Sequence, residues 1–308
     1  MVKKELLVSI ALCSYNGEKY IGQQLDSILN QTYKNIEIVI VDDHSTDGTF
    51  DILRRYAVEH PQIKLFRNEA NLGFNKNFEK AISLASGDYI AISDQDDIWL
   101  PEKIETLLNS IGDNWLIFSN SSYIGGKPGN NLLHKAGLSF SNYKSILLAN
   151  FVTGHTTLFK KEFVEHLLPF PLKGFYDWWM GFVALYHGKI IFLDMPLTQH
   201  RLHEESVMQR RLSSGEESFQ QVKATSHMLS AFSRYKGLSV ADRRFIIELK
   251  NAYRKTYRRK RSFSLIQLIV TNYRELFSNY KVRQGLSVLN FAFKYAGKVR
   301  TRATLNLT

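Results

Sequence analysis

Short, almost continuous apolar runs alternate with helical patterns along the first two hundred residues. The runs are rich in β-branched residues, as expected of strands covered on both faces. They are residues 6–13, 36–42, 63–67, 88–93 and 115–119. Between them, apolar residues recur at helical spacing over about residues 18–30, 47–59, 75–85 and 101–111. This alternation predicts a mostly parallel α/β sheet with helices on both faces.

Polar side chains gather where three of the predicted strands end. They are Tyr15 and Asn16 after the first strand, Asp42 and Asp43 after the second, and Asp94, Asp96 and Asp97 after the fourth. Ligands of such sheets lie outside the carboxyl ends of the strands. We therefore expect these three strand ends to form one ligand site.

From about residue 215 the strand patterns stop and the chain becomes strongly basic. Residues 1–200 carry 18 Lys or Arg and 22 Asp or Glu, a net charge of −4, whereas residues 201–308 carry 22 and 7, a net charge of +15. In residues 242–277 the basic residues are mixed with Phe, Tyr, Ile and Leu at helical spacing, which is typical of helices with one apolar and one cationic face. The sequence predicts an α/β domain over 1–212 and a basic helical tail over 213–308.

The remaining composition narrows the class of protein. Cys13 is the single cysteine, which excludes an internal disulfide, and it is expected to be a small core residue because no partner base is near it in sequence. The apolar stretch at the N-terminus is too short for a signal peptide and leads directly into a strand pattern. No window approaches the roughly 20 apolar residues of a spanning helix. We expect a globular protein of the cytosol.

Asp94, Asp96 and Asp97 stand together directly after an apolar strand. Like charges this close repel one another and raise one another's pKa unless a positive charge lies among them. A hard divalent cation takes oxygen ligands and would relieve the repulsion. The alternative is a solvated turn that favours acidic residues ahead of the helix at Pro101. Asp97 is expected to cap that helix while its neighbours bind the ion.

Two segments carry a resemblance to a known family. They read VSIALCSYNGEKYIGQQLDSILNQTYKNIEIVIVDDHSTDGT and NLGFNKNFEKAISLASGDYIAISDQDD. They resemble the nucleotide-sugar-binding half of family 2 glycosyltransferases, and the resemblance covers roughly residues 6–205. It implies the GT-A fold, a Rossmann-like mixed sheet with helices on both faces, followed here by the basic α-helical region. SDQDDIWLPEKI is particularly similar to bacterial enzymes that add rhamnose or related sugars to polysaccharide precursors.

The resemblance places the nucleotide base of a donor between Tyr15 and Asp43. In the family these positions hold the base by stacking and by a carboxylate that accepts a base N–H. For Asp43 the alternative is a turn aspartate that bonds its own backbone ahead of the helix, a role that Asp42 can take instead.

The resemblance also assigns the donor's phosphates. Asp94 and Asp96 match the family's metal motif, in which the carboxylates approach the ribose and a Mg²⁺ or Mn²⁺ ion on the diphosphate. Arg201 and His203 in HRLHEES match a segment near the end of the family's catalytic domain. An arginine gives bidentate contact to phosphate, and a neutral histidine can ligate a metal, so both are candidates for the diphosphate and its ion.

The acceptor side is implied by residues 150–179. Asp177 matches the family's general base, and its aromatic neighbours would raise the pKa of its carboxyl toward a useful range. Many members carry Glu-Asp where this chain has Tyr176 and Asp177, which leaves one candidate base; the alternative for Asp177 is an N-cap. Gly154, His155 and Trp178 match the acceptor side, although a lone histidine is more often structural.

Together these implications describe an inverting, metal-dependent transfer of rhamnose or another hexose from a nucleotide diphosphate to a saccharide hydroxyl, with a lipid-linked acceptor. A retaining or phospho-sugar-transferring relative on the same fold remains the alternative among enzymes. A nucleic-acid-binding protein is a third reading, suggested by the pI of about 9.5 and the basic, aromatic tail. The acidic ligand edge of the sheet argues against it, because that edge would repel a phosphate backbone.

The tail carries a prediction of its own. Residues 243–261 hold nine Lys or Arg, and the apolar residues interleaved with them are Phe245, Ile246, Ile247, Tyr253 and Tyr257. This composition favours reversible binding to the anionic inner face of the cell membrane, so we expect a cytoplasmic, peripheral location. Packing against the catalytic domain or against a second subunit of a homo-oligomer is the alternative.

Overall fold

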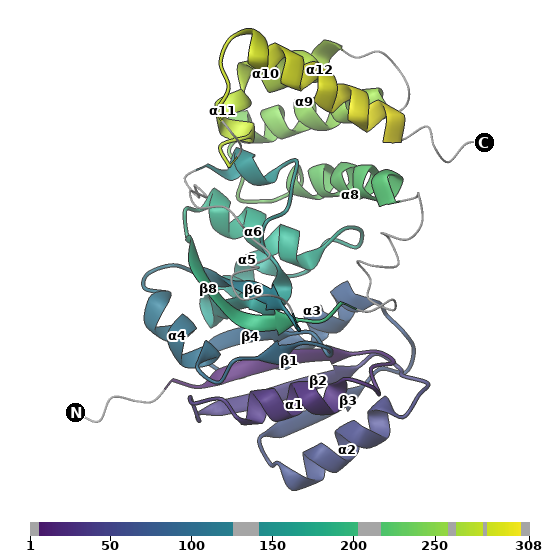
Figure 1. Ribbon diagram of the computed structural model, residues 1–308, viewed down its shortest axis with the longest axis vertical. Helices are drawn as coiled ribbons and strands as arrows, with labels where there is room; N and C mark the ends of the chain where they lie inside the picture. Colours follow the sequence, from purple (N-terminus) through teal and green to yellow (C-terminus); the bar gives the residue numbers. More distant parts are fainter. Residues whose placement is uncertain (1–5, 126–141, 203–216, 258–262, 280–281, 303–308) are drawn as a thin grey trace. The chain divides into compact units, whose positions relative to one another are not determined.

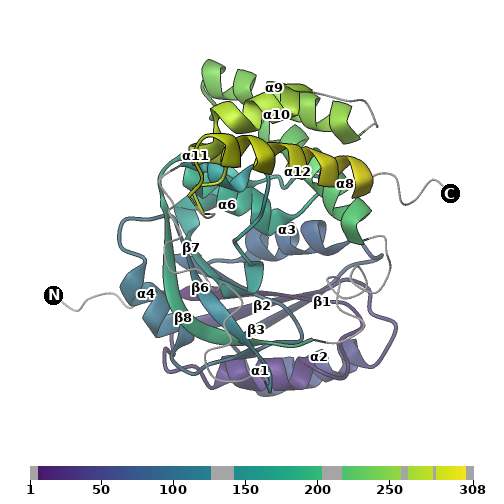
Figure 2. The same cartoon turned by 45° about the horizontal axis from the view of Figure 1, so that its top comes forward.

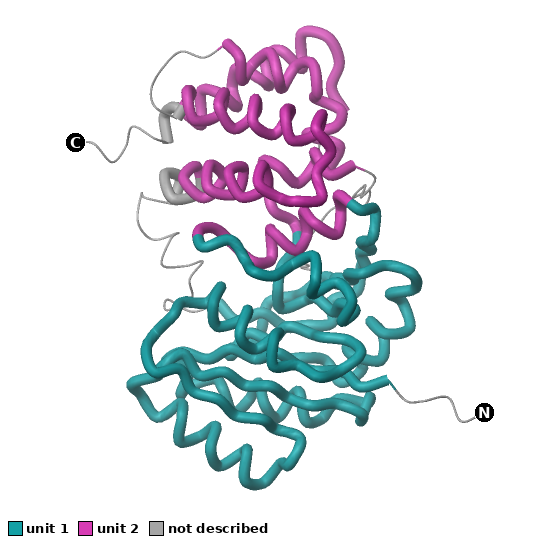
Figure 3. The backbone as a smooth tube through the Cα atoms, turned by 180° about the vertical axis from the view of Figure 1, so that it is seen from behind, with its two compact units in different colours: residues 1–134, 152–172, 187–202 teal, residues 135–151, 173–186, 203–308 magenta. Residues whose placement is uncertain are grey.

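The computed structural model describes residues 6–125, 142–202, 217–257, 263–279 and 282–302. The chain packs into two compact units that interleave along the sequence (Figure 3). Unit 1 comprises residues 1–134, 152–172 and 187–202, and unit 2 comprises residues 135–151, 173–186 and 203–308. Unit 2 therefore contains the predicted tail and two segments that precede it. A functional division between residues 212 and 213 stays a prediction.

Unit 1 is built on an eight-stranded sheet of order β3-β2-β1-β4-β7-β6-β8-β5. Its parallel half consists of β1 (Val8–Ser14), β2 (Ile36–Asp42), β3 (Ile63–Arg67) and β4 (Tyr89–Ser93). The other half consists of β7 (Thr157–Lys160), β6 (Leu116–Tyr123), β8 (Ile190–His200) and β5 (Ile98–Trp99), and β7 is antiparallel to both β4 and β6. The predicted α/β class is confirmed, and each of the five predicted strands corresponds to one of these.

Helices cover both faces of the parallel half. Figure 2 shows α1 (Ile21–Leu29) and α2 (Thr49–Glu59) on one face and α3 (Phe74–Leu84) on the other. The chain runs outward from β1 through β2 to β3 and returns to β4 on the far side of β1, so right-handed crossovers place α3 opposite the first two helices. The carboxyl ends of β1 and β4 therefore meet where the strand order reverses, the point at which such sheets bind ligands.

Two smaller helices complete unit 1 (Figure 1). They are α4 (Lys103–Ser110), which packs against β6, β7 and β8, and α5 (Val164–Leu167). A core cluster of the unit joins Ile10 and Ile38 of the sheet with Leu25 of α1 and Ile104 of α4. Cys13 is buried at the end of β1, as predicted, and burial raises the pKa of its thiol well above the usual value, with Asp94 and Asp43 adding to the effect.

Unit 2 is helical in its described part, which confirms the predicted helical region. Its elements are the 3₁₀ turn η1 (Tyr143–Ile146) and the helices α6 (Tyr176–Tyr186), α8 (Glu217–Phe232), α9 (Val240–Tyr257), α10 (Phe263–Thr271), α11 (Tyr273–Leu276) and α12 (Leu286–Arg302). Aromatic rings fill the contact of α6 with α8: the Phe182 and Phe232 rings stack with centroids 4.2 Å apart. Among the described residues, none of the helices has both the length and the apolar character needed to cross a membrane.

Asp242 joins three segments of unit 2. Its carboxylate accepts hydrogen bonds from the hydroxyls of Tyr143 (2.6 Å), Tyr186 (3.0 Å) and Ser239 (2.6 Å). Ser239 Oγ in turn accepts the backbone N–H of Asp242 and so caps the start of α9. Burial alone would raise the pKa of Asp242, but these hydrogen bonds outweigh it and the pKa is lowered. Asp242 thus ties α9 to α6 and η1.

Candidate active site

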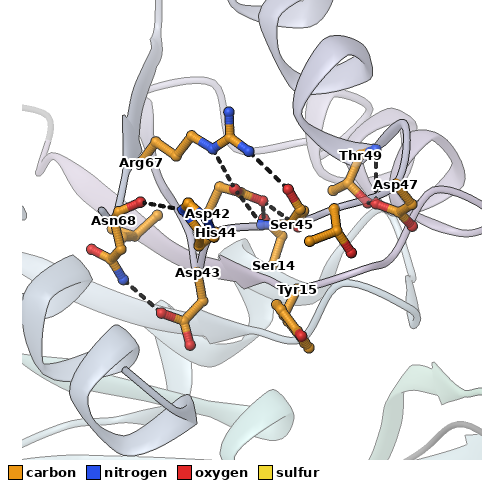
Figure 4. Close-up of polar contacts among 12 residues, drawn as sticks. Ser14, Tyr15, Asp42, Asp43, His44, Ser45, Asp47, Thr49, Arg67 and Asn68 are labelled. Atoms are coloured by element: carbon orange, nitrogen blue, oxygen red, sulfur yellow. Dashed lines mark hydrogen bonds and ion pairs between the residues drawn. The ribbon is translucent and has the colours of Figure 1, made fainter. Parts of the chain in front are cut away.

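Asp42 locks the ends of β1 and β2 together. Its buried carboxylate accepts hydrogen bonds from Ser14 Oγ (3.1 Å), Ser45 Oγ (2.5 Å) and the backbone N–H of Ser45 (3.0 Å) (Figure 4). Arg67 Nε lies 3.4 Å from the same carboxylate. Asp42 is therefore the turn aspartate of this loop, and it holds the strand ends on which the neighbouring site residues stand.

Asp43 is buried but bonds a different part of the chain. Its carboxylate accepts hydrogen bonds from Asn68 Nδ2 and from the backbone N–H groups of Leu72 and Gly73, each 2.8 Å long. These bonds shape the loop that leads into α3. The alternative of a bond to its own turn is wrong for Asp43. A carboxylate has about four acceptor positions, so one position is left for a base N–H, and that contact stays a prediction.

The residues after β1 and β2 have unusual backbone conformations. Asn16 (φ 50°) and His44 (φ 64°) are the non-glycine residues with positive φ in the described chain. Such conformations cost energy and persist where the surroundings enforce them, often at functional sites. Here Asn16 Oδ1 accepts the N–H of Thr46, at 2.8 Å, which links the two loops. Beside them the side chain of Tyr15 is 45% exposed, and Figure 4 shows it on the same side of the strand ends as Asp43.

The acidic loop after β4 has a partly exposed and a buried part. Asp94 and Asp96 are partly exposed, whereas Asp97 is fully buried. The predicted cap role of Asp97 is wrong, because α4 begins at Lys103 with Glu102 before it. Asp97 Oδ1 instead lies 2.9 Å from His200 Nδ1, at the end of β8.

His155 completes a cluster with Asp97 and His200. The ligand atoms of the three side chains lie within 4.8 Å of one another, and the imidazole rings stack with centroids 5.0 Å apart. Asp97 Oδ2 is buried 3.8 Å from His155 Nδ1 and has no hydrogen-bond partner in the described part of the chain, a costly state for a buried acceptor. Burial opposes ionisation of both Asp97 and His200. The charge of His155 and the hydrogen bond to His200 outweigh burial at Asp97, so its pKa is lowered. The hydrogen bond to Asp97 and the nearby carboxylates outweigh burial at His200, so its pKa is raised.

Lys103 lies next to this cluster and is fully buried. Its amine donates hydrogen bonds to the backbone oxygen of His155 (2.6 Å) and to Thr198 Oγ1 (2.9 Å), and it lies 3.6 Å from the centroid of the Trp99 ring. Burial lowers the pKa of Lys103 well below its usual value, although the charges of Asp97 and Asp94 oppose the shift. Lys103 thereby connects α4, the His155 segment and β8 behind the acidic loop.

Arg201 brings the end of β8 to the same edge of the sheet. Its Nε donates to the backbone oxygen of Asp96 (3.0 Å), its Nη2 donates to Gln23 Oε1 (2.7 Å), and its guanidinium lies 4.9 Å from the centroid of the Tyr20 ring. The structure thus brings together Asp94, Asp96 and Arg201, as the sequence predicted for a phosphate site. The predicted ligand His203 lies outside the described residues.

The predicted acceptor residues fall in both units. Gly154 and His155 lie buried in the 3₁₀ turn η2 (Gly154–Thr156) of unit 1, whereas Asp177 and Trp178 lie in the first turn of α6 in unit 2. Trp178 is a core residue, since it is buried and its indole N–H donates to the backbone oxygen of Ile146. Asp177 Oδ1 accepts the N–H of Trp178 at 2.6 Å. The roles of these residues toward an acceptor stay predictions.

Several residues of the site were not found from the sequence. From the sequence, Lys103 would be expected at the surface, because lysine is rarely fully buried. Asn68 and Asn77 bond each other at 2.9 Å beneath Asp43, and only their places after β3 and in α3 mark them. His200 directly precedes Arg201 in the HRLHEES motif, and this position next to a predicted site residue is the one sequence feature that marks it.

The carboxylates and imidazoles of this edge fit a divalent cation in two ways. Asp94 and Asp96 present oxygen ligands at the strand end, the donor set that Mg²⁺ and Mn²⁺ share. Deeper in unit 1, Asp97, His155 and His200 offer one carboxylate and two imidazoles, a mixed set better suited to Mn²⁺ than to Mg²⁺. The unpartnered oxygen of Asp97 is the observation in favour of the inner site.

Comparison with known proteins adds the family. A model of the family described as glycosyl transferase family 2 matches residues 9–168. An uncharacterized glycosyltransferase of Haemophilus influenzae is 33% identical over 221 residues, which cover 64% of this chain and 66% of the relative. The glucosyltransferase WfaP of Escherichia coli, named UDP-Glc:α-D-GlcNAc-diphosphoundecaprenol β-1,3-glucosyltransferase, is 38% identical over 117 residues, 38% of this chain and 46% of the relative. The chain spans less than two thirds of the length of either relative.

Solved structures share the fold across nearly the whole chain. Residues 1–349 of Staphylococcus aureus TarS in complex with UDP-GlcNAc superpose with a TM-score of 0.61 at 19% identity, covering 97% of this chain and 90% of that one. The mannosyltransferase PcManGT of Pyrobaculum calidifontis, in complex with GDP-Man and Mn²⁺, has a TM-score of 0.55 at 17% identity, covering 99% and 84%. The predicted GT-A fold is confirmed.

Proposed function

The chain belongs to glycosyltransferase family 2, and we propose that it transfers a sugar from a nucleotide diphosphate to a saccharide hydroxyl in cell-surface polysaccharide synthesis. The observation that carries the proposal is the meeting of Tyr15, the Asp94–Asp96 loop and Arg201 where the strand order reverses between β1 and β4. The nucleotide-sugar complexes of TarS and PcManGT, which have the same fold, support this class of donor. Rhamnose or another hexose is the proposed sugar.

The residues of unit 1 divide the work of holding the donor. The exposed ring of Tyr15 offers a stacking surface for the base, and Asp43 beside it has one acceptor position left for a base N–H. Arg201 offers the diphosphate a cation whose position is fixed by Asp96 and Gln23. The bonds of Asp42 hold the loops between which the base would lie.

A Mg²⁺ or Mn²⁺ ion is the proposed cofactor, held by Asp96 with Asp94 beside it and with His203 as a further ligand. Such an ion neutralises charge that develops on a leaving diphosphate. Around this edge the cluster of Asp97 and the two histidines keeps the acidic loop fixed to β8. Arg201 contributes a second, permanent positive charge next to the phosphates.

Asp177 is the proposed general base of an inverting reaction. Its carboxylate takes the proton of the acceptor hydroxyl, and the oxygen attacks the anomeric carbon from the face opposite the nucleotide. The bond from that carbon to the diphosphate breaks, and its electron pair leaves with the nucleotide diphosphate. Support comes from the place of Asp177 in the first turn of α6, where the described chain has no second carboxylate.

The proposal includes a lipid-linked acceptor at the cytoplasmic face of the cell membrane. The name of WfaP states that this relative acts on a sugar linked to diphosphoundecaprenol. The +15 charge of residues 201–308 would attract the chain to an anionic leaflet, which makes the location peripheral. Arg258, Arg259, Lys260 and Arg261, the densest basic run, lie outside the described residues. Association of copies into a homo-oligomer remains the alternative use of this surface.

A panel of nucleotide sugars tests the proposed function. The pure protein is incubated with UDP-, GDP- and dTDP-sugars, with Mn²⁺, Mg²⁺ or chelator, and hydrolysis and thermal stability are followed. We expect one nucleotide to raise the melting temperature in a metal-dependent manner, because ligand that binds only the folded state stabilises it. NMR of the product's anomeric proton then reports inversion. Absence of hydrolysis and of stabilisation with every donor would overturn the proposal.

A further inference from the structure

The apolar residues of α9 that the sequence offered to a membrane are mostly buried. Ile246 and Tyr253 lie in the core of unit 2, where α9 packs against α8, α10 and α12. Phe245 is half-buried, with Lys144 Nζ 4.3 Å from its ring centroid. The prediction that apolar residues of this segment enter a lipid headgroup region is therefore wrong for Ile246 and Tyr253, because both side chains are buried inside the unit. Among the four of these residues whose side chains are described, Ile247 is the exception at 36% exposed, so a larger apolar contact with lipid needs residues outside this set.

Helix α12 has an exposed apolar stripe. Leu286, Leu289 and Phe293 are 83%, 39% and 48% exposed. Their spacing of three and four residues places them on one face of the helix. The neighbouring face, about 100° away around the helix, is packed within unit 2, with Val288 and Ala292 buried. The residues of the stripe are therefore not those by which α12 packs within unit 2. Contiguous exposed apolar surface of this kind marks a contact with a partner or a lipid.

The charges around the stripe identify what it fits. Lys294 and Lys298 are exposed on the same helix, one turn apart, at about 100–140° around its axis from Phe293. Residues 282–302 contain five Lys or Arg and no Asp or Glu. Between residues 263 and 302 Glu275 is the single acid, and it is paired with Lys144. Apolar side chains flanked only by cations are complementary to an anionic bilayer, whose phosphates lie just above its acyl chains.

We propose that α12 is the element of this chain that contacts the membrane. Leu286, Leu289 and Phe293 enter the headgroup region of an anionic leaflet, and Lys294 and Lys298 pair with lipid phosphates. The inference rests on the proposed membrane location and assigns it to one helix face. Both the apolar stripe and the two lysines are needed, since the stripe alone would bind neutral lipid equally well.

Vesicle co-sedimentation of the full chain tests the assignment. Vesicles of phosphatidylcholine, with or without phosphatidylglycerol, are mixed at low salt with the unchanged chain, with Leu286→Ser/Leu289→Ser/Phe293→Ser, and with Lys294→Gln/Lys298→Gln. We expect the triple variant to lose at least about tenfold in partition coefficient, and the lysine pair about fivefold per charge on anionic vesicles only. Retained stabilisation by donor shows that each variant is folded.

Matched controls carry the same changes elsewhere on unit 2. Val240→Ser/Ile247→Ser removes exposed apolar residues of α9, where Val240 is 88% exposed, and Lys236→Gln/Lys255→Gln removes two exposed charges. Both controls are expected to bind within about twofold of the unchanged chain. If α12 variants and controls lose equally, the assignment to α12 fails.

The outcomes separate this inference from the proposed function. Binding of the unchanged chain that survives the triple change leaves membrane location intact but overturns the role of α12. If the unchanged chain does not bind anionic vesicles, both the membrane location and the role of α12 are overturned. Donor hydrolysis tests glycosyl transfer independently of either. If sedimentation velocity shows a dimer of the unchanged chain and a monomer of the triple variant, the stripe is a contact between copies. This result too would overturn the inference.

Discussion

A β-carbon on Gly17 would meet the side-chain amide of Gln95, with Cδ, Oε1 and Nε2 all at 3.0 Å or less. That amide accepts the backbone N–H of Tyr15 at 2.8 Å and donates to the backbone oxygen of Tyr15 at 3.1 Å. Gln95 therefore joins the ends of β1 and β4, and the absence of a side chain at residue 17 leaves it the space to do so.

Gly17→Ala is expected to weaken donor binding by about three- to tenfold, because the displaced Gln95 no longer fixes the loop that carries Tyr15. Gln95→Ala should weaken binding by a similar factor. The double variant should be no worse than Gln95→Ala alone, since both changes remove one interaction. Titration calorimetry with the nucleotide diphosphate measures all three. If the losses in donor affinity of the two single variants add in the double variant, Gly17 affects binding by a route other than Gln95.

Asp96→Ala is expected to abolish transfer and to remove the metal-dependent part of the stabilisation by nucleotide diphosphate. The fold should survive, because Asp96 is partly exposed at a strand end. Thermal denaturation with and without Mn²⁺ and nucleotide provides the measurement. Asp97→Asn is the informative comparison: if it alone abolishes the metal effect, the ion occupies the inner cluster with His155 and His200. Full activity in excess chelator would exclude a catalytic metal altogether.

Asp177→Asn keeps the size and hydrogen bonding of the side chain but cannot accept a proton. Turnover should fall by about two to four orders of magnitude while the donor dissociation constant stays within about twofold. Steady-state rates and donor titration on the same preparation give both quantities. A loss of donor affinity that accounts for the whole loss of rate would reassign Asp177 to binding.

Glu37→Gln is expected to lower the stability of unit 1 in a pH-dependent way. Burial raises the pKa of Glu37, but hydrogen bonds from Lys64, Ser9 and Ser86 outweigh it and lower the pKa from 4.5 to about 2. The ionised form is thus favoured by folding. Its contribution is full above the unfolded pKa near 4.5 and is lost as the pH falls toward about 2.

At pH 7 the shift corresponds to about 2–3 kcal/mol of unfolding free energy, the lower end applying because Lys64 is half-exposed. Urea denaturation of both proteins at pH 7 and near pH 3 measures the difference. It should shrink on acidification, and a constant difference would mean that the charge of Glu37 does not stabilise the fold.

Three strands of the parallel half were predictable because they are buried on both faces. β1, β2 and β4 are continuous apolar runs that no helix period fits. β8 was not predicted, since its middle is partly exposed and carries Asp194 and Pro196. Pro196 pairs with Asn120 where the β6–β8 register shifts, and a proline there removes the regular pattern by which a strand is recognised.

The positions of the strand ends predicted where the candidate site lies, but they did not predict which hydrogen bonds hold its residues. Tyr15 and Asp94 follow parallel neighbours, so their proximity follows from topology. Gln95 bonds Tyr15, and Lys103 bonds His155 and Thr198 behind the acidic loop. These partners are far apart in sequence, and no local pattern records such contacts. In the tail, periodicity predicted helices; it did not distinguish Ile246, which is buried, from Leu286, which is exposed.

The interleaving of unit 2 sets an order for biosynthesis. Trp179 and Phe182 of α6 stack on Phe232, and Tyr186 bonds Asp242, so α6 leaves the ribosome well before its partners do. Until then η1 is available to α6, but the aromatic rings that meet α8 lack their partner, and exposed apolar surface of this kind is prone to aggregate. A product that stops after residue 212 would still contain Asp177 and would be expected to aggregate, because the C-terminal helices complete the folding of the helix that carries this residue.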